Sequence, residues 1–351
     1  MASKAARDGT NDDAPAGWWQ RIGLGSGQWA SAAQTPERNG GVIPSRFMVR
    51  PLLVAAWILT TAVASAHPGT AADIAALTQK LAERPGDVDL LLQRAEAHRR
   101  QGQIDPALRD LKEAARHAPL RREIYLERGL VRMAQGKPGL AEADLTRYLD
   151  AGAPSATALA ARGRIREADK RWAQARADYD AALKLGADVE LYLGRGRADE
   201  ALGQLARAAA GYEEGLKALG GAVTLRLPLV RVEMARGRHD RALAIVEEAL
   251  AAAPVRAEWL LRRAEIHAAA GRAEAAESDR VAALHEAEAQ LDRRPNDLAR
   301  LVRARALLAL GRAAEAAPEF ERIVKSSPRL TEAKPLLAQA RQSTATPTKK
   351  R

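Results

Sequence analysis

The stretch that decides the fold is residues 90–119, LLLQRAEAHRRQGQIDPALRDLKEAARHAP, because the same order of residues returns near the other end of the chain. Residues 300–328 read RLVRARALLALGRAAEAAPEFERIVKSSP. In both stretches an arginine precedes a small residue, glycine stands seven positions after the small residue, alanine follows five positions later, and proline closes the stretch. Self-similarity at a fixed period is typical of repeat proteins, in which each unit packs on its neighbours.

Three columns of residues define the repeat units. The small residue returns at spacings of 34, 34, 33, 34, 34 and 40 positions, at Ala95, Gly129, Gly163, Gly196, Val230, Ala264 and Ala304. Glycine stands seven positions later in six of the seven units, with Lys170 the exception, and alanine stands twelve positions later in all seven. Glycine accepts the positive φ at the end of a helix, and small residues let two helices approach closely. Each unit is therefore expected to be a helix, a turn and a second helix.

This pattern resembles the tetratricopeptide repeat, a helix-turn-helix unit of 34 residues, and the match covers residues 88–328. The resemblance implies an all-α fold, a right-handed α-solenoid of about seven units that binds proteins or peptides and is not an enzyme. Three departures are expected to distort the superhelix. They are Lys170 at the turn of the third unit, Pro228 inside the first helix of the fifth, and a long second helix in the sixth, residues 273–295.

The two ends of the array are predicted to be caps. Residues 67–87 hold an amphipathic helix over Thr70–Pro85, in which Thr70 and Asp73 are placed as in a capping box. Residues 329–351 hold a final helix, expected to be interrupted by Pro335, followed by a basic tail. Such end helices cover the exposed face of the first or last unit.

Residues 48–66 have the three parts of a secretory signal. Arg46 and Arg50 precede an apolar run, and the small residues Ala64-Ser65-Ala66 end it. Cleavage after Ala66 would release a periplasmic or secreted protein. The apolar segment, residues 51–66, is shorter than the roughly 20 residues that span a bilayer, but an uncleaved membrane anchor and a buried helix remain alternatives. Residues 1–47 lack periodicity and are interpreted as an upstream extension outside the true start, or as a tail.

Composition excludes several kinds of active site. The chain has no cysteine, so it has no thiol nucleophile, no cysteine-based zinc site and no lipoprotein anchor. Its six histidines are not at metal-ligand spacing, and no glycine-rich loop resembles a phosphate cradle. The net charge is +11, but aromatic residues make up only 4% of the chain, and single-strand nucleic-acid binders need aromatic side chains for stacking. We expect no catalytic residue, no metal, no cofactor and no nucleic-acid partner.

An arginine column explains part of the positive charge. Arginine precedes the small residue in six units, and an acid stands sixteen positions later in five of them. The pairs are Arg94 with Asp110, Arg128 with Asp144, Arg162 with Asp178, Arg263 with Asp279, and Arg303 with Glu319. The fifth unit has lost both partners, having Leu229 and Ile245 instead, and Arg195 faces Gly211 and is predicted to be unpaired. We interpret the column as structural ion pairs between the two helices of one unit.

The candidate binding groove lies on the first helices. Positions three before, one after and four after the small residue share one helix face. In units three to five the position one after it holds Arg164, Arg197 and Arg231. The same face offers apolar side chains, namely Leu126, Leu130, Met133, Leu193, Leu227 and Met234. This mixture suits an extended acidic peptide with apolar anchors, or an exposed C-terminal carboxylate. The alternative is a solvated face on which Glu167 and Glu200 balance ordinary arginines.

Together these observations predict an exported, non-catalytic scaffold that binds a protein or peptide partner, acidic if the arginines are used, in its concave groove. Contact with a membrane is expected only if residues 51–66 stay uncleaved. The alternatives are a membrane-anchored envelope assembly factor and a non-catalytic subunit of an envelope enzyme complex. The residues do not identify the partner.

Overall fold

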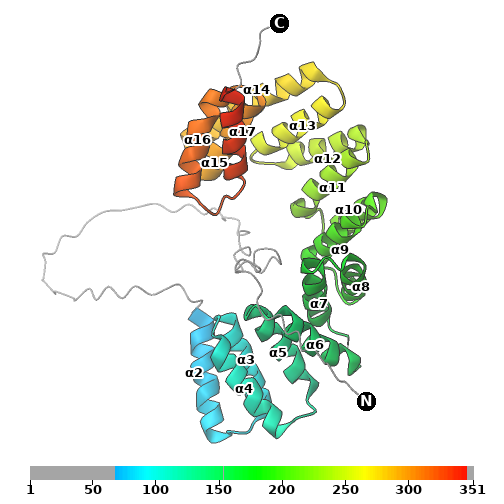
Figure 1. Ribbon diagram of the computed structural model, residues 1–351, viewed down its shortest axis with the longest axis vertical. Helices are drawn as coiled ribbons and strands as arrows, with labels where there is room; N and C mark the ends of the chain where they lie inside the picture. Colours follow the sequence, from blue (N-terminus) through cyan, green and yellow to red (C-terminus); the bar gives the residue numbers. More distant parts are fainter. Residues whose placement is uncertain (1–67, 153, 346–351) are drawn as a thin grey trace, which may run out of the picture. The chain divides into compact units, whose positions relative to one another are not determined.

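The computed structural model describes residues 68–152 and 154–345 (Figure 1). The predicted extension and signal, residues 1–66, lie outside the described residues, as does the end of the basic tail. The described part contains α-helices, one short 3₁₀ helix and no strands, which confirms the all-α prediction. No helix in this part is both long and apolar enough to span a membrane.

The helices follow one another as antiparallel pairs. The chain begins with α2 (Pro68–Glu83), and the first two pairs are α3 (Val88–Arg100) with α4 (Ile104–His117) and α5 (Arg122–Ala134) with α6 (Pro138–Asp150). The next pairs are α7 (Ala156–Ala168) with α8 (Trp172–Leu183), α9 (Val189–Ala201) with α10 (Leu205–Ala218), and α11 (Arg226–Ala235) with α12 (His239–Ala252). The last are α13 (Ala257–Ala269) with α14 (Ala273–Arg293) and α15 (Asp297–Ala309) with α16 (Ala313–Ser326), followed by α17 (Ala333–Ala345). The 3₁₀ helix η1 (Val223–Leu225) precedes α11. The seven pairs match the seven predicted units.

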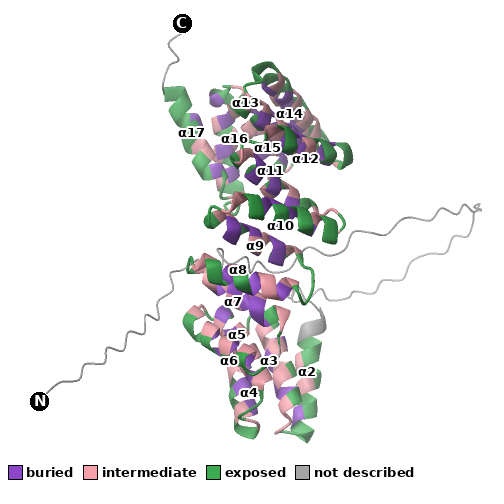
Figure 2. Ribbon diagram, turned by 90° about the vertical axis from the view of Figure 1, so that its right-hand side faces the viewer, coloured by how far each residue is buried: buried purple, intermediate pink, exposed green. Residues whose placement is uncertain are grey.

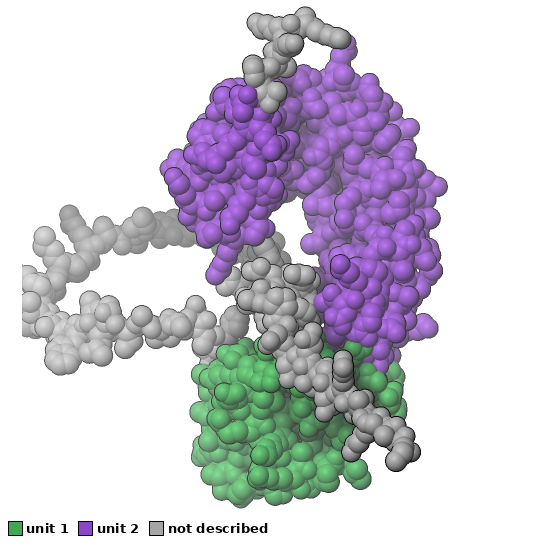
Figure 3. All heavy atoms as spheres, viewed as in Figure 1, with its two compact units in different colours: residues 1–154 green, residues 155–351 purple. Residues whose placement is uncertain are grey.

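The chain divides into two compact units, residues 1–154 and 155–351, which we call unit 1 and unit 2 (Figure 3). The described part of unit 1 holds α2 to α6, and unit 2 holds α7 to α17. Within unit 2 the helix pairs follow an arc, and the first helices of the pairs lie along its inner side (Figure 1). The space-filling view shows that this side of unit 2 is hollowed.

The small-residue columns form the contacts between helices. The alanine column is completely buried in all seven units, at Ala107, Ala141, Ala175, Ala208, Ala242, Ala276 and Ala316. A Cβ atom added at Gly163 would lie 3.1 Å from the ring of Tyr179, and one at Gly196 would lie 2.2 Å from the ring of Tyr212. The buried residues follow one stripe of each helix (Figure 2). Small side chains thus set how closely the helices pack.

The residues of the turn column have the backbone conformation that a helix end requires. The six glycines of the column have φ between 72° and 79°, the left-handed region that glycine enters without strain. Lys170 occupies the same place in the third unit and has φ 60°, and it is the single non-glycine residue with positive φ in the described chain. The third unit therefore keeps its turn without glycine.

Two expectations about prolines and caps need correction. Thr70 is not an N-cap, because α2 begins at Pro68 and Thr70 lies inside the helix. Pro335 does not interrupt α17, since it falls in the first turn, where proline costs no hydrogen bond. Pro228 lies inside the first helix of the fifth unit, as expected, in the first turn of α11, which has ten residues and follows η1.

The long helix and the end cap agree with the sequence. The helix α14 has 21 residues, as the long second helix of the sixth unit predicts. The final helix α17 buries Ala333 and Ala340, while most of its other residues are exposed or half-buried (Figure 2). A last helix with one buried stripe and a polar outer face is what closes a repeat array.

Candidate binding groove

The five predicted arginine–acid pairs are present. Their N–O distances are 2.7 Å in Arg94–Asp110, 2.7 Å in Arg128–Asp144, 2.8 Å in Arg162–Asp178, 2.6 Å in Arg263–Asp279 and 3.2 Å in Arg303–Glu319. In each of the first four the carboxylate is almost fully buried, and in each of the five it lies on the second helix of the unit. Each pair joins the two helices of one unit.

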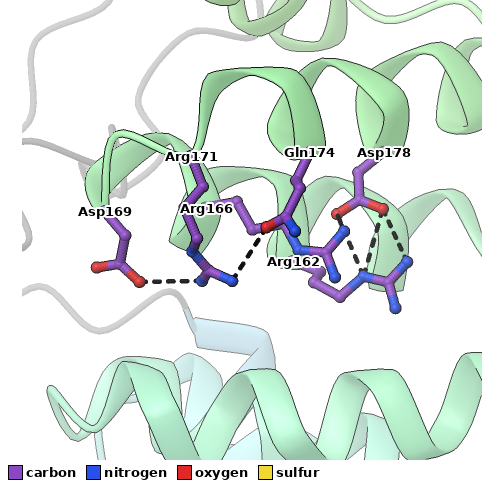
Figure 4. Close-up of polar contacts among 6 residues, drawn as sticks. All are labelled: Arg162, Arg166, Asp169, Arg171, Gln174 and Asp178. Atoms are coloured by element: carbon purple, nitrogen blue, oxygen red, sulfur yellow. Dashed lines mark hydrogen bonds and ion pairs between the residues drawn. The ribbon is translucent and has the colours of Figure 1, made fainter.

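A second basic residue reaches the same carboxylate in four units. Arg166, one turn after Arg162 on α7, donates to Asp178 of α8 at 2.9 Å (Figure 4). Arg132 donates to Asp144 at 2.6 Å, and His98 and His267 lie 3.9 and 3.8 Å from Asp110 and Asp279. These arginines and histidines are therefore part of the scaffold and are not available to bind an anion.

In the fourth and fifth repeat units the buried acid lies on the first helix instead of the second. They lack the second-helix acid, and the position of Arg132 and Arg166 instead holds the buried acids Asp199 and Glu233. Asp199 lies 2.7 Å from Arg176 of the preceding unit, and Glu233 accepts from Arg236 at 2.7 Å. Burial raises the pKa of Asp199, and the charge of Arg176 opposes that rise.

Arg195 is paired, so the expectation that it has no partner is wrong. Its Nη2 donates to Glu214 at 2.7 Å and lies 3.4 Å from the carbonyl oxygen of Gly211. The acid lies nineteen positions along the chain instead of sixteen. The long arginine side chain reaches one turn further along α10 to find it.

Two of the three candidate groove arginines bridge neighbouring units. Arg197 of α9 donates twice to Glu167 of α7, at 2.6 and 3.2 Å. Arg231 of α11 donates to Glu200 of α9 at 3.0 Å. Arg164, which is half-buried, has no ion-pair partner among the described residues. The arginines that suggested an acidic ligand are thus largely neutralised within the protein.

Each bridging carboxylate also binds a buried tyrosine. Tyr179 donates to Glu167 at 2.6 Å, and Tyr212 donates to Glu200 at 2.7 Å. Burial and the adjacent carboxylate raise the pKa of both tyrosines, so both stay protonated as donors. Burial acts to lower the pKa of Arg197, but the hydrogen bonds and charge of Glu167 outweigh it and the pKa is raised. Tyrosine, glutamate and the next unit's arginine form one connected network.

A cavity of about 520 Å³ opens between α11 and α13, and we call it the α11–α13 pocket. It is lined by Leu227, Pro228, Val230, Arg231 and Met234 from α11 and by Arg262 and Glu265 from α13. Leu227 is 38% exposed. A second cavity of about 220 Å³ shares Glu265 and continues over α15 and α17. The lining of the first is apolar at its centre and charged at its rim.

The ion pairs at the rim of the pocket hold its shape. Arg262 donates to Glu265 at 2.9 Å and lies 3.1 Å from Glu258. Arg305 of α15 donates to the same Glu258 at 2.7 Å. This network of charges across α13 and α15 fixes the rim side chains.

The sequence profile of the tetratricopeptide repeat matches residues 92–156, 126–190, 227–279 and 278–331, more than half of the chain. The chain belongs to the tetratricopeptide repeat family. The columns of small residues, turn glycines and closing prolines are thus those of tetratricopeptide repeats.

Solved structures of other tetratricopeptide repeat proteins have the same fold. A tetratricopeptide repeat protein from Parabacteroides merdae is 20% identical, with a TM-score of 0.53 over 72% of this chain and 98% of that chain. Yeast Tom70 is 15% identical, with a TM-score of 0.52 over 79% of this chain and 59% of that chain. No curated protein sequence matches this chain. Identities this low show the fold alone.

The predicted groove residues of this tetratricopeptide repeat protein are divided between the two units. Leu227, Arg231 and Met234 meet in the α11–α13 pocket of unit 2. Leu193, also in unit 2, is half-buried against the core. Leu126 and Leu130 are half-buried on α5 of unit 1, and Met133 is only 3% exposed, so it offers no surface to a ligand.

Four pocket residues, Pro228, Val230, Arg262 and Glu265, were not among the predicted groove residues. Glu265 occupies in the sixth repeat the position that holds Arg164, Arg197 and Arg231 in the earlier repeats. At this position the sequence changes from arginine in the third to fifth repeats to glutamate in the sixth, so the series of arginines ends there. No group of His, Asp and Glu among the described residues could hold a metal ion.

Proposed function

We propose that this protein is an exported, non-catalytic scaffold that holds an extended segment of a partner protein in the α11–α13 pocket. The pocket carries the proposal because it combines an exposed leucine, a proline and a methionine with fixed charges at its rim. Its volume lies within the range of about 300 to 1,000 Å³ that is usual for ligand sites. An apolar side chain of the partner would enter between α11 and α13.

The charges favour apolar anchoring over a purely acidic ligand. Arg231 already binds Glu200, and Arg262 already binds Glu265, so an acidic segment would have to compete with both carboxylates. Replacing Arg164, Arg197 and Arg231 together would also expose the half-buried Glu167 and Glu200. Arg164→Gln alone is the cleaner measure of a preference for acidic partners.

We expect Leu227→Glu to weaken peptide binding by more than tenfold, about 1.4 kcal/mol. The reason is that a carboxylate would lie at the apolar floor of the pocket and would have to lose its water when an apolar side chain enters. Peptides are first selected from a random phage-displayed library on the full chain. Their Kd for the unaltered and altered proteins is then measured by fluorescence polarisation.

Val281→Glu is the matched control for this substitution. Val281 is also an exposed apolar residue inside a helix of unit 2, but it lies on α14 and outside the pocket lining. We expect its Kd to stay within about twofold. Equal affinity of the two variants, or failure to select any peptide, would show that the pocket is not the binding site.

The export part of the proposal rests on residues 48–66. Their basic, apolar and small-residue parts follow one another in the order that signal peptidase recognises. N-terminal sequencing of the protein isolated from its native host is expected to start at His67. Recovery of peptides from residues 1–47, or of an intact segment 51–66 in the mature protein, would overturn this expectation.

A further inference from the structure

Within unit 2, the connections between successive helix pairs form one edge. Successive helices run antiparallel, so each connection from a second helix to the next first helix lies at the same end of the helix pairs. We define the inter-unit edge of unit 2 by nine residues at these connections. They are Lys184, Leu185, Val223, Arg226, Val255, Arg256, Arg293, Arg294 and Leu298.

This edge exposes one large aliphatic side chain at each of four connections. Leu185, Val223, Val255 and Leu298 are between 46 and 60% exposed. In the described chain, nine large apolar side chains are exposed, and five lie at connections of this kind, the fifth being Leu120 in unit 1. A single exposed leucine needs no explanation, but its recurrence at the four successive connections from α8 to α15 is a pattern.

The same edge carries basic side chains that have no partner. Lys184, Arg226, Arg256, Arg293 and Arg294 form no ion pair within the described chain. Most arginines of α7 to α16 are paired, as the groove shows. Each of the four aliphatic side chains thus has a free cation within a few positions of it in the sequence.

Acidic residues at these connections offset the charge only in part. Asp188 accepts from the backbone of Glu190 as the N-cap of α9. Asp297 accepts from Ser326, Ser327 and Arg300, and these hydrogen bonds lower its pKa to about 2. Asp292 lies beside Arg293, and Glu190 is an exposed acid in the first turn of α9. The edge keeps an excess of positive charge.

We propose that the inter-unit edge of unit 2 rests on an anionic lipid bilayer. Aliphatic side chains enter the headgroup region while neighbouring cations bind lipid phosphates, which is how interfacial proteins hold a charged membrane. Lysine and arginine have stems long enough to stay with the phosphates while the aliphatic side chain sinks deeper. This contact needs no apolar membrane span and is independent of the α11–α13 pocket.

A bilayer fits this edge better than a folded partner or a nucleic acid. The aliphatic side chains occur one per unit, and neither of the two cavities of unit 2 described above includes any of them. A fluid headgroup layer adapts to such separate points, whereas a protein interface needs a packed central cluster. The edge contains no aromatic residue for base stacking.

The test is co-sedimentation of the full chain with vesicles of phosphatidylcholine alone or mixed with phosphatidylglycerol, at physiological salt. We expect binding to the mixed vesicles only. Arg226→Gln/Arg256→Gln/Arg294→Gln is expected to weaken it by more than about tenfold, since each cation near an anionic surface contributes about fivefold. Val223→Ser/Val255→Ser is expected to weaken it several-fold.

Each edge variant has a matched control with the same chemical change elsewhere in unit 2. Arg164→Gln/Lys170→Gln/Arg238→Gln removes three other cations that lack an ion pair in the described chain, and Leu202→Ser/Val281→Ser removes two other exposed aliphatic side chains. Both controls are expected to bind within about twofold of the unaltered protein. They carry the same segment 51–66, so that segment cannot produce a difference.

Four results would overturn the proposal. The unaltered protein could bind mixed vesicles no better than neutral ones, or edge variants and controls could lose equal affinity. Loss in the arginine triple variant alone would exclude insertion of the aliphatic side chains. A DNA duplex is tested in parallel. If the arginine triple variant loses affinity for the duplex while no form binds vesicles, the edge is a nucleic-acid surface and the proposal is wrong.

Discussion

Gly196→Ala is expected to lower the free energy of unfolding by about 2 to 3 kcal/mol, although alanine is the better helix former. The added Cβ would lie 2.2 Å from the ring of Tyr212, far inside van der Waals contact. Tyr212 cannot move away easily, because its ring is completely buried and its hydroxyl binds Glu200 at 2.7 Å. The clash therefore also disturbs the ion pair between Glu200 and Arg231.

The measurement is urea denaturation followed by circular dichroism at the helix band. Gly139→Ala in α6 is the matched control, because nothing lies within 4 Å of its added Cβ and its φ is not positive. We expect this control to be unchanged or up to about 1 kcal/mol more stable. A Gly196→Ala protein as stable as the control would mean that Tyr212 is free to shift.

Asp178→Asn is expected to cost about 3 kcal/mol. The Asp178 side chain is 4% exposed and accepts from both Arg162 and Arg166. An amide of the same shape cannot neutralise these two guanidinium groups, which are themselves less than a fifth exposed. Two neighbouring cations would then be left in a poorly hydrated site. The free energy of unfolding is again measured with urea.

Asp240→Asn is the comparison that shows how much of the loss comes from burial of the ion pair and how much from the ion pair itself. Asp240 accepts from Arg272 at 2.8 Å, but its side chain is 86% exposed. We expect a loss below about 0.5 kcal/mol, since water and salt screen exposed pairs. Equal losses in the two variants would contradict the view that the shared, buried carboxylate supports the third unit.

The features inside one unit could be predicted from the sequence because they repeat at a fixed separation. Arg162 and Asp178 are sixteen positions apart, and the same separation returned in four other units. The turn glycines and buried alanines were predicted on the same basis. A residue type that recurs at the same position of every repeat has the same structural role in each repeat, so each repeat supports the prediction made for the others.

Contacts between units were harder to predict. The bridges from Arg197 to Glu167 and from Arg231 to Glu200 span 30 and 31 positions. Their existence depends on how one helix pair is rotated against the next, and periodicity within a helix does not give that rotation. The sequence placed Glu167 and Glu200 near the arginines but not in contact with the arginine of the following unit.

Only the α11 side of the pocket could be predicted, because the other side depends on how neighbouring repeats stack. Leu227, Arg231 and Met234 share one face of α11, which helical spacing gives directly. Arg262 and Glu265 come from α13, and only the stacking of the fifth and sixth units brings them opposite. The buried acids Asp199 and Glu233 lie on first helices, and the column of acids on the second helices gives no signal of them.

The bridge between units also bears on how the array can change in evolution. Glu167 and Glu200 hold equivalent places, as do Arg197 and Arg231. A gene that lost the codons for residues 197–230 would bring Glu167 opposite Arg231, with Tyr179 still beneath the carboxylate. A duplication there would add one more identical joint. The equivalent positions of the next pair of units hold Met234 and Glu265 instead of glutamate and arginine, so this exchange is confined to the repeats between α7 and α11.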